Sequence, residues 1–117
     1  MSKKRVLYAE DDLANRKLLE IKLERAGFEC DVVENGSLAL QMYADNKYDL
    51  VVLDQYMPEL NGEEVAAEIR RFSTDIPLIA ITSDDTLRTH LLKRGFNEVI
   101  VKPLRGDEAI DLIKSYL

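Results

Sequence analysis

The sequence has 117 residues, of which 46% are hydrophobic and 32% charged, and its net charge is -6 at pH 7. This length and composition predict one compact globular domain and exclude a disordered or membrane-embedded chain. The acidic balance argues against direct binding to nucleic acid, because phosphate contacts need a cationic surface. No apolar run is as long as a signal peptide or a membrane span, so we expect a cytoplasmic protein that does not associate with membranes.

Five short apolar runs predict β-strands that alternate with helical segments along the chain. They cover residues 5–9, 29–33, 49–54, 77–82 and 98–102. The first, third and fourth are almost continuously apolar, as in a parallel sheet that helices cover on both faces. The second alternates more strongly, which favours an edge strand and places Cys30 at a half-buried position. The alternation of strands and helices predicts an α/β fold with a parallel sheet.

Apolar residues at helical spacing predict the helices between these strands. The expected inner-face residues are Leu19, Leu23 and Ala26, then Val65, Ile69 and Phe72, then Leu87 and Leu91, and finally Ile110, Ile113 and Leu117. A further helix is expected over residues 37–44. Asp12 suits the N-cap of the first helix and Gly27 its C′ position. His90 lies beside the apolar stripe of the fourth helix, so we expect it at the surface.

Ionisable and hydroxyl-bearing residues stand at the ends of the predicted strands. They are Glu10, Asp11 and Asp12 after the first strand, Asp54 at the end of the third, Thr82 at the end of the fourth and Lys102 at the end of the fifth. Because the carboxyl ends of parallel strands lie at one edge of a sheet, we expect these side chains to lie close together. Clustered carboxylates repel one another unless a cation intervenes, and Mg²⁺ prefers oxygen ligands. The backbone carbonyl of Tyr56 could complete such a site.

An aspartate beside Mg²⁺ and an ammonium group is a competent nucleophile toward phosphorus. We therefore interpret Asp54 as a phosphoryl acceptor, with Lys102 and the Thr82 hydroxyl neutralising and orienting the phosphoryl group. Each residue alone also has a structural explanation: Asp54 as a turn residue, Asp11 and Asp12 as helix caps, Thr82 as a side-chain turn. Their coincidence at successive strand ends favours the functional interpretation.

With these residues in this order, the chain resembles the receiver domain of bacterial two-component response regulators over essentially residues 1–117. The matching motifs are AEDD after the first strand with Arg16 in the next helix, DQYMPELNG after the third strand, ITS after the fourth and VKP after the fifth. The resemblance implies a single-domain flavodoxin-like (βα)5 fold, with five parallel strands in the order 2-1-3-4-5 and helices on both faces.

The resemblance also implies a role for each matching residue. Asp54 corresponds to the phosphorylated aspartate, Asp11 to a direct Mg²⁺ ligand and Glu10 to a ligand that acts through water. Thr82 matches the hydroxyl that hydrogen-bonds the phosphoryl group, and Lys102 matches the lysine that pairs with it.

Other positions match the family pattern or depart from it. The peptide bond before Pro103 is commonly cis in this family, and Gly62 matches a loop position closed to bulkier residues. Tyr56 and Asp84 lie two residues after the aspartate and the threonine, where family members modulate phosphoryl lifetime. A bulky ring would hinder the attacking water, whereas an acid would orient it. Val99 replaces the Tyr or Phe whose ring moves on activation, so an aromatic rotamer switch is excluded.

The resemblance implies Mg²⁺ as cofactor and a sensor histidine kinase or a histidine phosphotransfer protein as phosphoryl donor. It also implies a downstream target protein or domain, and it is compatible with a phosphorylation-dependent homodimer. The chain would be a regulatory phosphoacceptor that catalyses only its own phosphorylation and dephosphorylation.

The alternatives belong to other functional classes. An aspartate-dependent phosphatase-like enzyme of the same general fold class would place a second acid where this chain has Tyr56. A flavodoxin-like FMN binder is disfavoured by the acidic loop after the first strand, because FMN phosphate needs donors and glycines there. A scaffolding variant that is not phosphorylated would have lost Asp54, Asp11 or Lys102, and this chain keeps all three.

Overall fold

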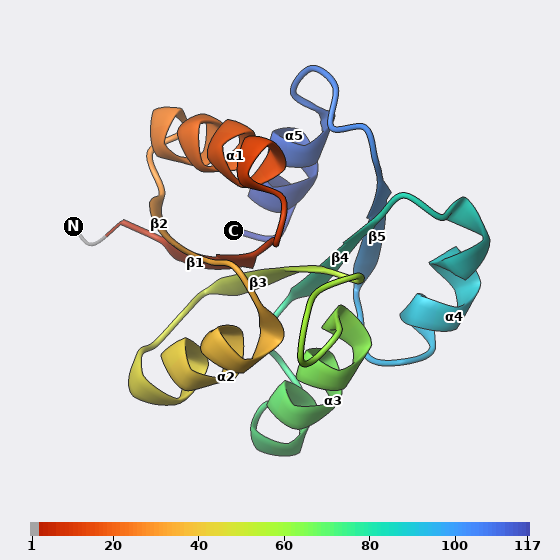
Figure 1. The fold of residues 1–117 in the computed structure, drawn as a ribbon. Coiled ribbons are helices and arrows are strands. Elements are labelled where there is room, and N and C mark those ends of the chain that lie inside the picture. The colour runs from red at the N-terminus through yellow and green to blue at the C-terminus, as the bar shows by residue number, and fades with distance from the viewer. Residues whose placement is uncertain (1–2) are drawn as a thin grey trace.

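The structure is a computed structural model that describes residues 3–117, so the first two residues of the expected domain lie outside the described residues. Within this range, five parallel strands form one sheet in the order β2-β1-β3-β4-β5 (Figure 1). The strands are β1 Arg5–Ala9, β2 Glu29–Val33, β3 Leu50–Asp54, β4 Leu78–Thr82 and β5 Glu98–Val101. The predicted strand order, the parallel pairing and the edge position of β2 are confirmed.

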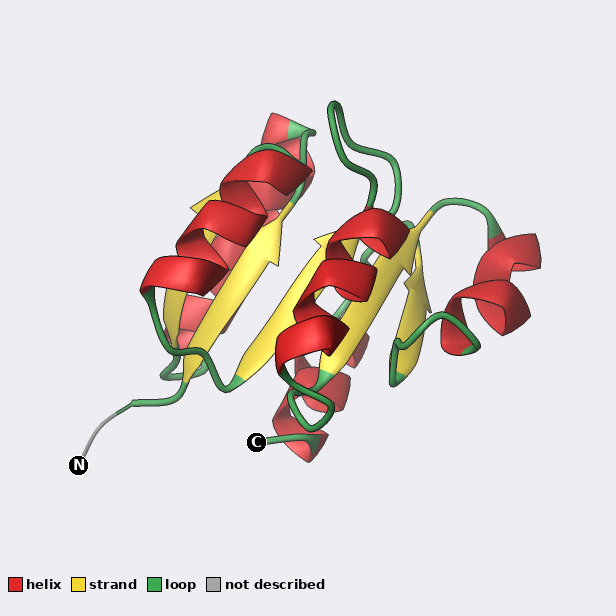
Figure 2. Cartoon of the chain, turned by 90° about the horizontal axis from the view of Figure 1, so that it is seen from below, coloured by secondary structure: helices red, strands yellow, loops and turns green. Residues whose placement is uncertain are grey.

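Helices connect the strands and cover both faces of the sheet. The five α-helices within residues 3–117 are α1 Leu13–Arg25, α2 Gly36–Asp45, α3 Gly62–Phe72, α4 Arg88–Leu92 and α5 Glu108–Ser115, and a short 3-10 helix, η1 Asp85–Leu87, precedes α4. Helices α1 and α5 lie on one face (Figure 1), and α2 and α3 lie side by side on the other, with α4 near the β5 edge (Figure 2). No helix of the described residues is long and apolar enough to cross a membrane.

The two faces of the sheet carry separate apolar layers, because successive residues of a strand point to opposite faces. Leu7 and Ala9 belong to the layer that packs with α2, α3 and α4, whereas Val6 and Tyr8 belong to the layer that packs with α1 and α5. Every residue of β3 and β4 is buried. Since helices cover both faces, the polar side chains at the strand ends gather at the carboxyl edge of the sheet.

Local signals at the ends of α1 are confirmed. The Asp12 carboxylate accepts a hydrogen bond from the backbone N–H of Asn15 at 2.8 Å, which is the contact of an N-cap residue. Gly27 directly follows the C-cap residue Ala26 and has a φ of 94°, the left-handed conformation that favours glycine. Cys30 is half-buried on β2, as predicted.

The prediction that Phe72 belongs to the inner face of α3 is wrong. Val65 and Ile69 are fully buried, but Phe72, the last residue of the helix, is 78% exposed and lines a groove with Leu40 and Tyr43 of α2. Helical spacing indicates the direction of a side chain, but it does not show whether a neighbouring element extends far enough to cover that side chain. The other expected inner-face residues are buried or partly buried.

Candidate functional site

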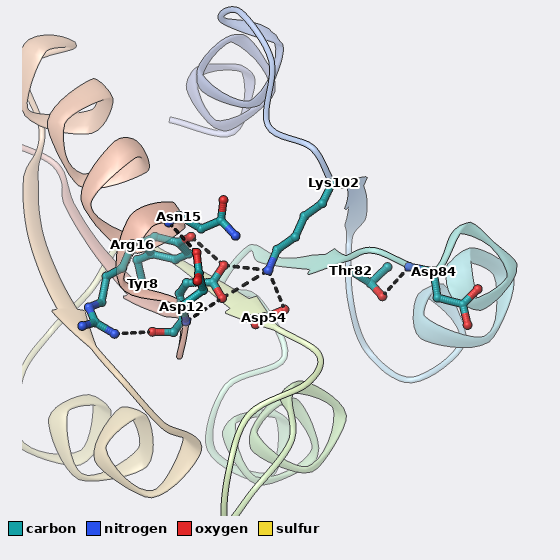
Figure 3. Close-up of polar contacts among 9 residues, drawn as sticks. Tyr8, Asp12, Asn15, Arg16, Asp54, Thr82, Asp84 and Lys102 are labelled. Atoms are coloured by element: carbon teal, nitrogen blue, oxygen red, sulfur yellow. Dashed lines mark hydrogen bonds and ion pairs between the residues drawn. The ribbon is translucent and has the colours of Figure 1, made fainter.

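Four of the predicted site residues meet at the carboxyl edge of the sheet. Glu10 and Asp11 follow β1, Asp54 is the last residue of β3, and Lys102 follows β5. The parallel register aligns these strand ends, and Lys102 points back from the end of β5 toward Asp54 (Figure 3). Residues up to 92 positions apart in the sequence therefore form one cluster.

Three carboxylates in this cluster could hold a metal ion. Glu10, Asp11 and Asp54 each offer an oxygen, and these oxygens lie within 4.8 Å of one another. Glu10 is fully buried and Asp54 is 3% exposed, whereas Asp11 is exposed and opens the group to solvent. Hard oxygen donors that are partly open to water suit Mg²⁺, which keeps several of its own waters when it binds protein. The donor set therefore fits the metal that the sequence predicted.

Lys102 is the cation that faces the buried carboxylates. Its Nζ lies 3.0 Å from Glu10 Oε1 and 3.5 Å from Asp54 Oδ1, and its side chain is only 17% exposed. The peptide bond between Lys102 and Pro103 is cis. Because one ammonium group faces two buried carboxyl groups, ionisation of both would leave a negative site, which a divalent cation would neutralise.

The crowding of carboxylates changes the acidity of the site. Burial, followed by the hydrogen bond and charge of Glu10, raises the pKa of Asp54 to about 8. Although burial acts in the opposite direction, hydrogen bonds from Asp54 and Lys102 hold the pKa of Glu10 below its ordinary value. The two carboxylates likewise raise the pKa of Lys102 against the effect of its burial. Without metal, Asp54 therefore keeps a proton at neutral pH, and Glu10 is the ionised member of the pair.

Two further residues orient Glu10. The hydroxyl of Tyr8 donates a hydrogen bond to Glu10 Oε1 at 3.1 Å, and the Arg16 guanidinium donates to the Glu10 backbone carbonyl at 2.8 Å (Figure 3). Sequence reasoning found Arg16 only as a matching motif residue and did not single out Tyr8, which lies in the first predicted strand. The signal that could have found Tyr8 is its spacing of two from Glu10, since residues i and i+2 of a strand lie on the same face.

The remaining predicted residues lie at the same edge and, in the described residues, form no hydrogen bond or ion pair with the Asp54 side chain. Thr82 is fully buried, and its hydroxyl accepts a hydrogen bond from the backbone N–H of Asp84 at 3.1 Å (Figure 3). A hydroxyl that accepts one bond can still donate its own proton to another group. The Asp84 carboxylate caps η1 by accepting from the backbone N–H of Thr86 at 3.0 Å. Tyr56 is 53% exposed in the loop after β3.

The loop after Asp54 returns closely against its own strand. Gly62 donates its backbone N–H to the Gln55 carbonyl at 3.0 Å, and a Cβ at position 62 would lie 2.6 Å from the Asp54 carbonyl oxygen. Position 62 thus excludes any larger residue for lack of space. Gln55, which is buried, was not found by sequence reasoning.

The family model of the response regulator receiver domain matches residues 6–114. The chain is a response regulator receiver domain. This match confirms the resemblance that the strand-end motifs predicted, and it gives no support to the phosphatase-like alternative.

Solved and curated relatives agree with this assignment. The receiver domain is similar to the response regulator TrrA from Thermotoga maritima in complex with Mg²⁺ and BeF, with 38% identity, a TM-score of 0.91, and coverage of 97% of this chain and 99% of that chain. TrrA in complex with the histidine kinase ThkA is similar with 36% identity, a TM-score of 0.87, and coverage of 97% and 98%. Response regulator MprA of Mycobacterium sp. strain KMS is 31% identical over 115 residues, which are 97% of this chain and 50% of that protein. The receiver domain thus spans about half the length of the curated relatives it matches.

Proposed function

We propose that residues 1–117 act as the phosphoacceptor domain of a two-component system, in which Asp54 receives a phosphoryl group from a phosphohistidine of a partner protein. The observation that carries this proposal is the position of Asp54, held at a central strand end beside Glu10 and Asp11 and facing the ammonium group of Lys102. The Mg²⁺ and BeF bound by TrrA support a phosphoryl site of this kind in a similar chain.

Glu10, Asp11 and Asp54, with the backbone carbonyl of Tyr56, would hold Mg²⁺ in this proposal. Bound Mg²⁺ supplies charge neutralisation for the phosphoryl oxygens and a fixed geometry for in-line transfer. The first step that the protein's own residues must make is the loss of a proton from Asp54. Because Asp54 is protonated in the metal-free site, it must first release that proton to solvent, and a carboxylate oxygen can then act as nucleophile.

In the transfer step, a carboxylate oxygen of Asp54 attacks phosphorus and the bond between phosphorus and the imidazole nitrogen breaks. The bonding electron pair stays on the imidazole of the partner, and Asp54 becomes an aspartyl phosphate. Lys102 pairs with one phosphoryl oxygen and the Thr82 hydroxyl donates to another, so that the negative charge is distributed over fixed partners.

Hydrolysis of the aspartyl phosphate completes the cycle. In this proposal it takes place within the same site and uses no second active centre. Two flanking residues modulate its rate in this proposal. The exposed ring of Tyr56 lies two residues beyond the acceptor and would hinder the attacking water. Asp84, whose backbone N–H donates to the Thr82 hydroxyl, would orient that water with its carboxylate.

The proposed partners are a sensor histidine kinase or a histidine phosphotransfer protein as donor, and a downstream protein or domain as target. The complex of TrrA with the kinase ThkA supports a kinase partner. We further propose a cytoplasmic location, no direct contact with nucleic acid or membrane, and a homodimer that forms only on phosphorylation. The net charge of -6 supports the lack of nucleic-acid contact.

A small phosphodonor such as acetyl phosphate tests the acceptor. With Mg²⁺, intact-mass spectrometry is expected to show one added phosphoryl group on the wild type and none after chelation of the metal. Asp54→Asn should prevent labelling, whereas Asp85→Asn, which removes an exposed carboxylate near the same edge, should leave labelling intact. Equal labelling of the Asp54→Asn protein would refute the assignment.

A further inference from the structure

Glu63, the second residue of α3, forms a two-pronged contact with the α4 segment. Its Oε2 lies 2.9 Å from His90 Nε2 in α4, and its Oε1 lies 2.7 Å from Arg94 Nε just after α4. The Glu63 side chain is only 19% exposed, while those of His90 and Arg94 are 52% and 56% exposed. Each carboxylate oxygen thus has its own partner, and the exposed position predicted for His90 is confirmed.

Helix α4 depends on such contacts because it is short. It has five residues, and Leu91 is the one that is fully buried. A second anchor is the Arg88 guanidinium, which donates to the Val99 carbonyl of β5 at 3.0 Å. A third is the Arg70 guanidinium of α3, which donates to the Gly95 carbonyl at 3.0 Å. A helix with little buried surface belongs to the part of a fold that opens at low free-energy cost.

On its other side, Glu63 is joined to the residue that follows the phosphoryl acceptor. The Glu63 backbone N–H donates to Gln55 Oε1 at 3.0 Å, and Gln55 is buried next to Asp54. The backbone of Gln55 is held as well, because its carbonyl accepts from Gly62. A displacement of the chain at Asp54 would therefore move the first turn of α3 and, with it, the carboxylate that holds α4.

We infer that Glu63 is a coupling residue, which transmits changes at Asp54 to α4 through its contacts with Gln55, His90 and Arg94. The inference rests on the proposed function of Asp54. The contacts of Glu63 give the chain a polar connection to α4. Val99, which is 3% exposed in the core, offers no aromatic ring that could take this role. A purely structural role would instead be that of an acid near the positive end of a helix dipole.

Glu64→Gln is the control that separates these two roles. Glu64 lies in the same first turn and forms the capping box with Asn61, which glutamine also forms. Glu63→Gln and Glu64→Gln therefore remove the same charge from the same helix end, but only the first removes the carboxylate that faces His90 and Arg94. Arg94→Gln removes the ion pair between Glu63 and Arg94 by a change just after α4, and it leaves the residues of α3 unchanged.

The experiment is amide hydrogen exchange with and without Mg²⁺ and beryllofluoride, on variants first shown by circular dichroism to be folded. In the wild type, the ligand should change exchange in residues 55–62 and in residues 88–95. In Glu63→Gln and in Arg94→Gln, the change at 55–62 should persist while that at 88–95 falls about fivefold, a typical coupling magnitude. Glu64→Gln should respond as the wild type does.

Two results would overturn this inference and leave the proposed function of Asp54 standing. One is an undiminished change in the exchange of residues 88–95 in Glu63→Gln, and the other is an equal loss of that change in Glu64→Gln. A wild type that does not bind beryllofluoride with Mg²⁺ would overturn the proposed function and this inference with it. The double variant Glu63→Gln with Arg94→Gln should be no more impaired than Glu63→Gln alone, because that single variant already removes the carboxylate that Arg94 contacts.

Discussion

Asp54→Asn is expected to stabilise the metal-free protein at neutral pH. The pKa of Asp54 is raised from 3.8 to about 8, so at pH 7 the unfolded chain has released a proton that the folded chain retains. Each pH unit between 3.8 and 7 costs the wild type about 1.4 kcal/mol, or roughly 4 kcal/mol in all. Asparagine has nearly the size of the protonated acid, can donate to Glu10, and does not ionise when unfolded. We expect it to add about 2 to 4 kcal/mol to the free energy of unfolding.

The sign of this effect gives it a pH window. A carboxyl group whose folded pKa is raised lowers stability as pH rises, beginning near its unfolded value of 3.8 and ending near its folded value of about 8. The gain from Asp54→Asn should therefore be close to zero at pH 4 and largest at pH 8. Mg²⁺ should reduce the difference, because binding to the carboxylate cluster stabilises the wild type alone.

Urea unfolding followed by circular dichroism, at pH 4.5, 6 and 8 with a chelator present, measures this difference. Asp85→Asn is the matched control, because Asp85 is exposed in η1 and its substitution removes the same carboxyl group from the unfolded chain. The reasoning is refuted if Asp54→Asn is no more stable than the wild type at pH 8, or if its gain is equally large at pH 4.5.

Three further predictions concern single residues. Lys102→Met should lower the free energy of unfolding by about 3 kcal/mol at pH 7, where the lysine, with its raised pKa, is charged and Glu10 is ionised, because buried Glu10 loses its cation. Urea titrations measure this loss, and an unchanged free energy of unfolding would contradict the prediction. Burial raises the pKa of Cys30 from 9.0 to about 12, so the thiolate fraction at pH 8 is about 1,000-fold lower than for an unperturbed thiol. Iodoacetamide, followed by mass spectrometry, should modify the folded protein slowly and the guanidinium-unfolded protein quickly, and equal rates would count against the prediction. Tyr8→Phe removes the hydroxyl that donates to buried Glu10 and should cost about 1 kcal/mol in chemical denaturation; an unchanged midpoint would show that the bond adds nothing to stability.

Much of the fold was predictable because its signals are local. The apolar runs located the strands to within one residue at each end, since strands covered on both faces are almost wholly apolar. Asp12 and Gly27 marked the ends of α1, because capping depends on neighbouring backbone groups alone. Phe72 shows the limit of such signals, since its exposure depends on how far α2 and the sheet extend beside it.

The site was predictable in its members but not in its contacts. Parallel strands bring their carboxyl ends to one edge, so the order of strands and acids in the sequence was sufficient to place Glu10, Asp54 and Lys102 together. That Tyr8 donates to Glu10 depended on the orientation of a tyrosine indistinguishable in sequence from a core residue.

The sequence by itself determined which residue types stand at the strand ends and hence the class of chemistry that the edge can support. Only the tertiary structure decided how close those groups lie, and with that the raised pKa of Asp54 and the two partners of Glu63. The physical reason is that charge interactions and desolvation depend on distances between residues far apart in the chain, and packing sets those distances.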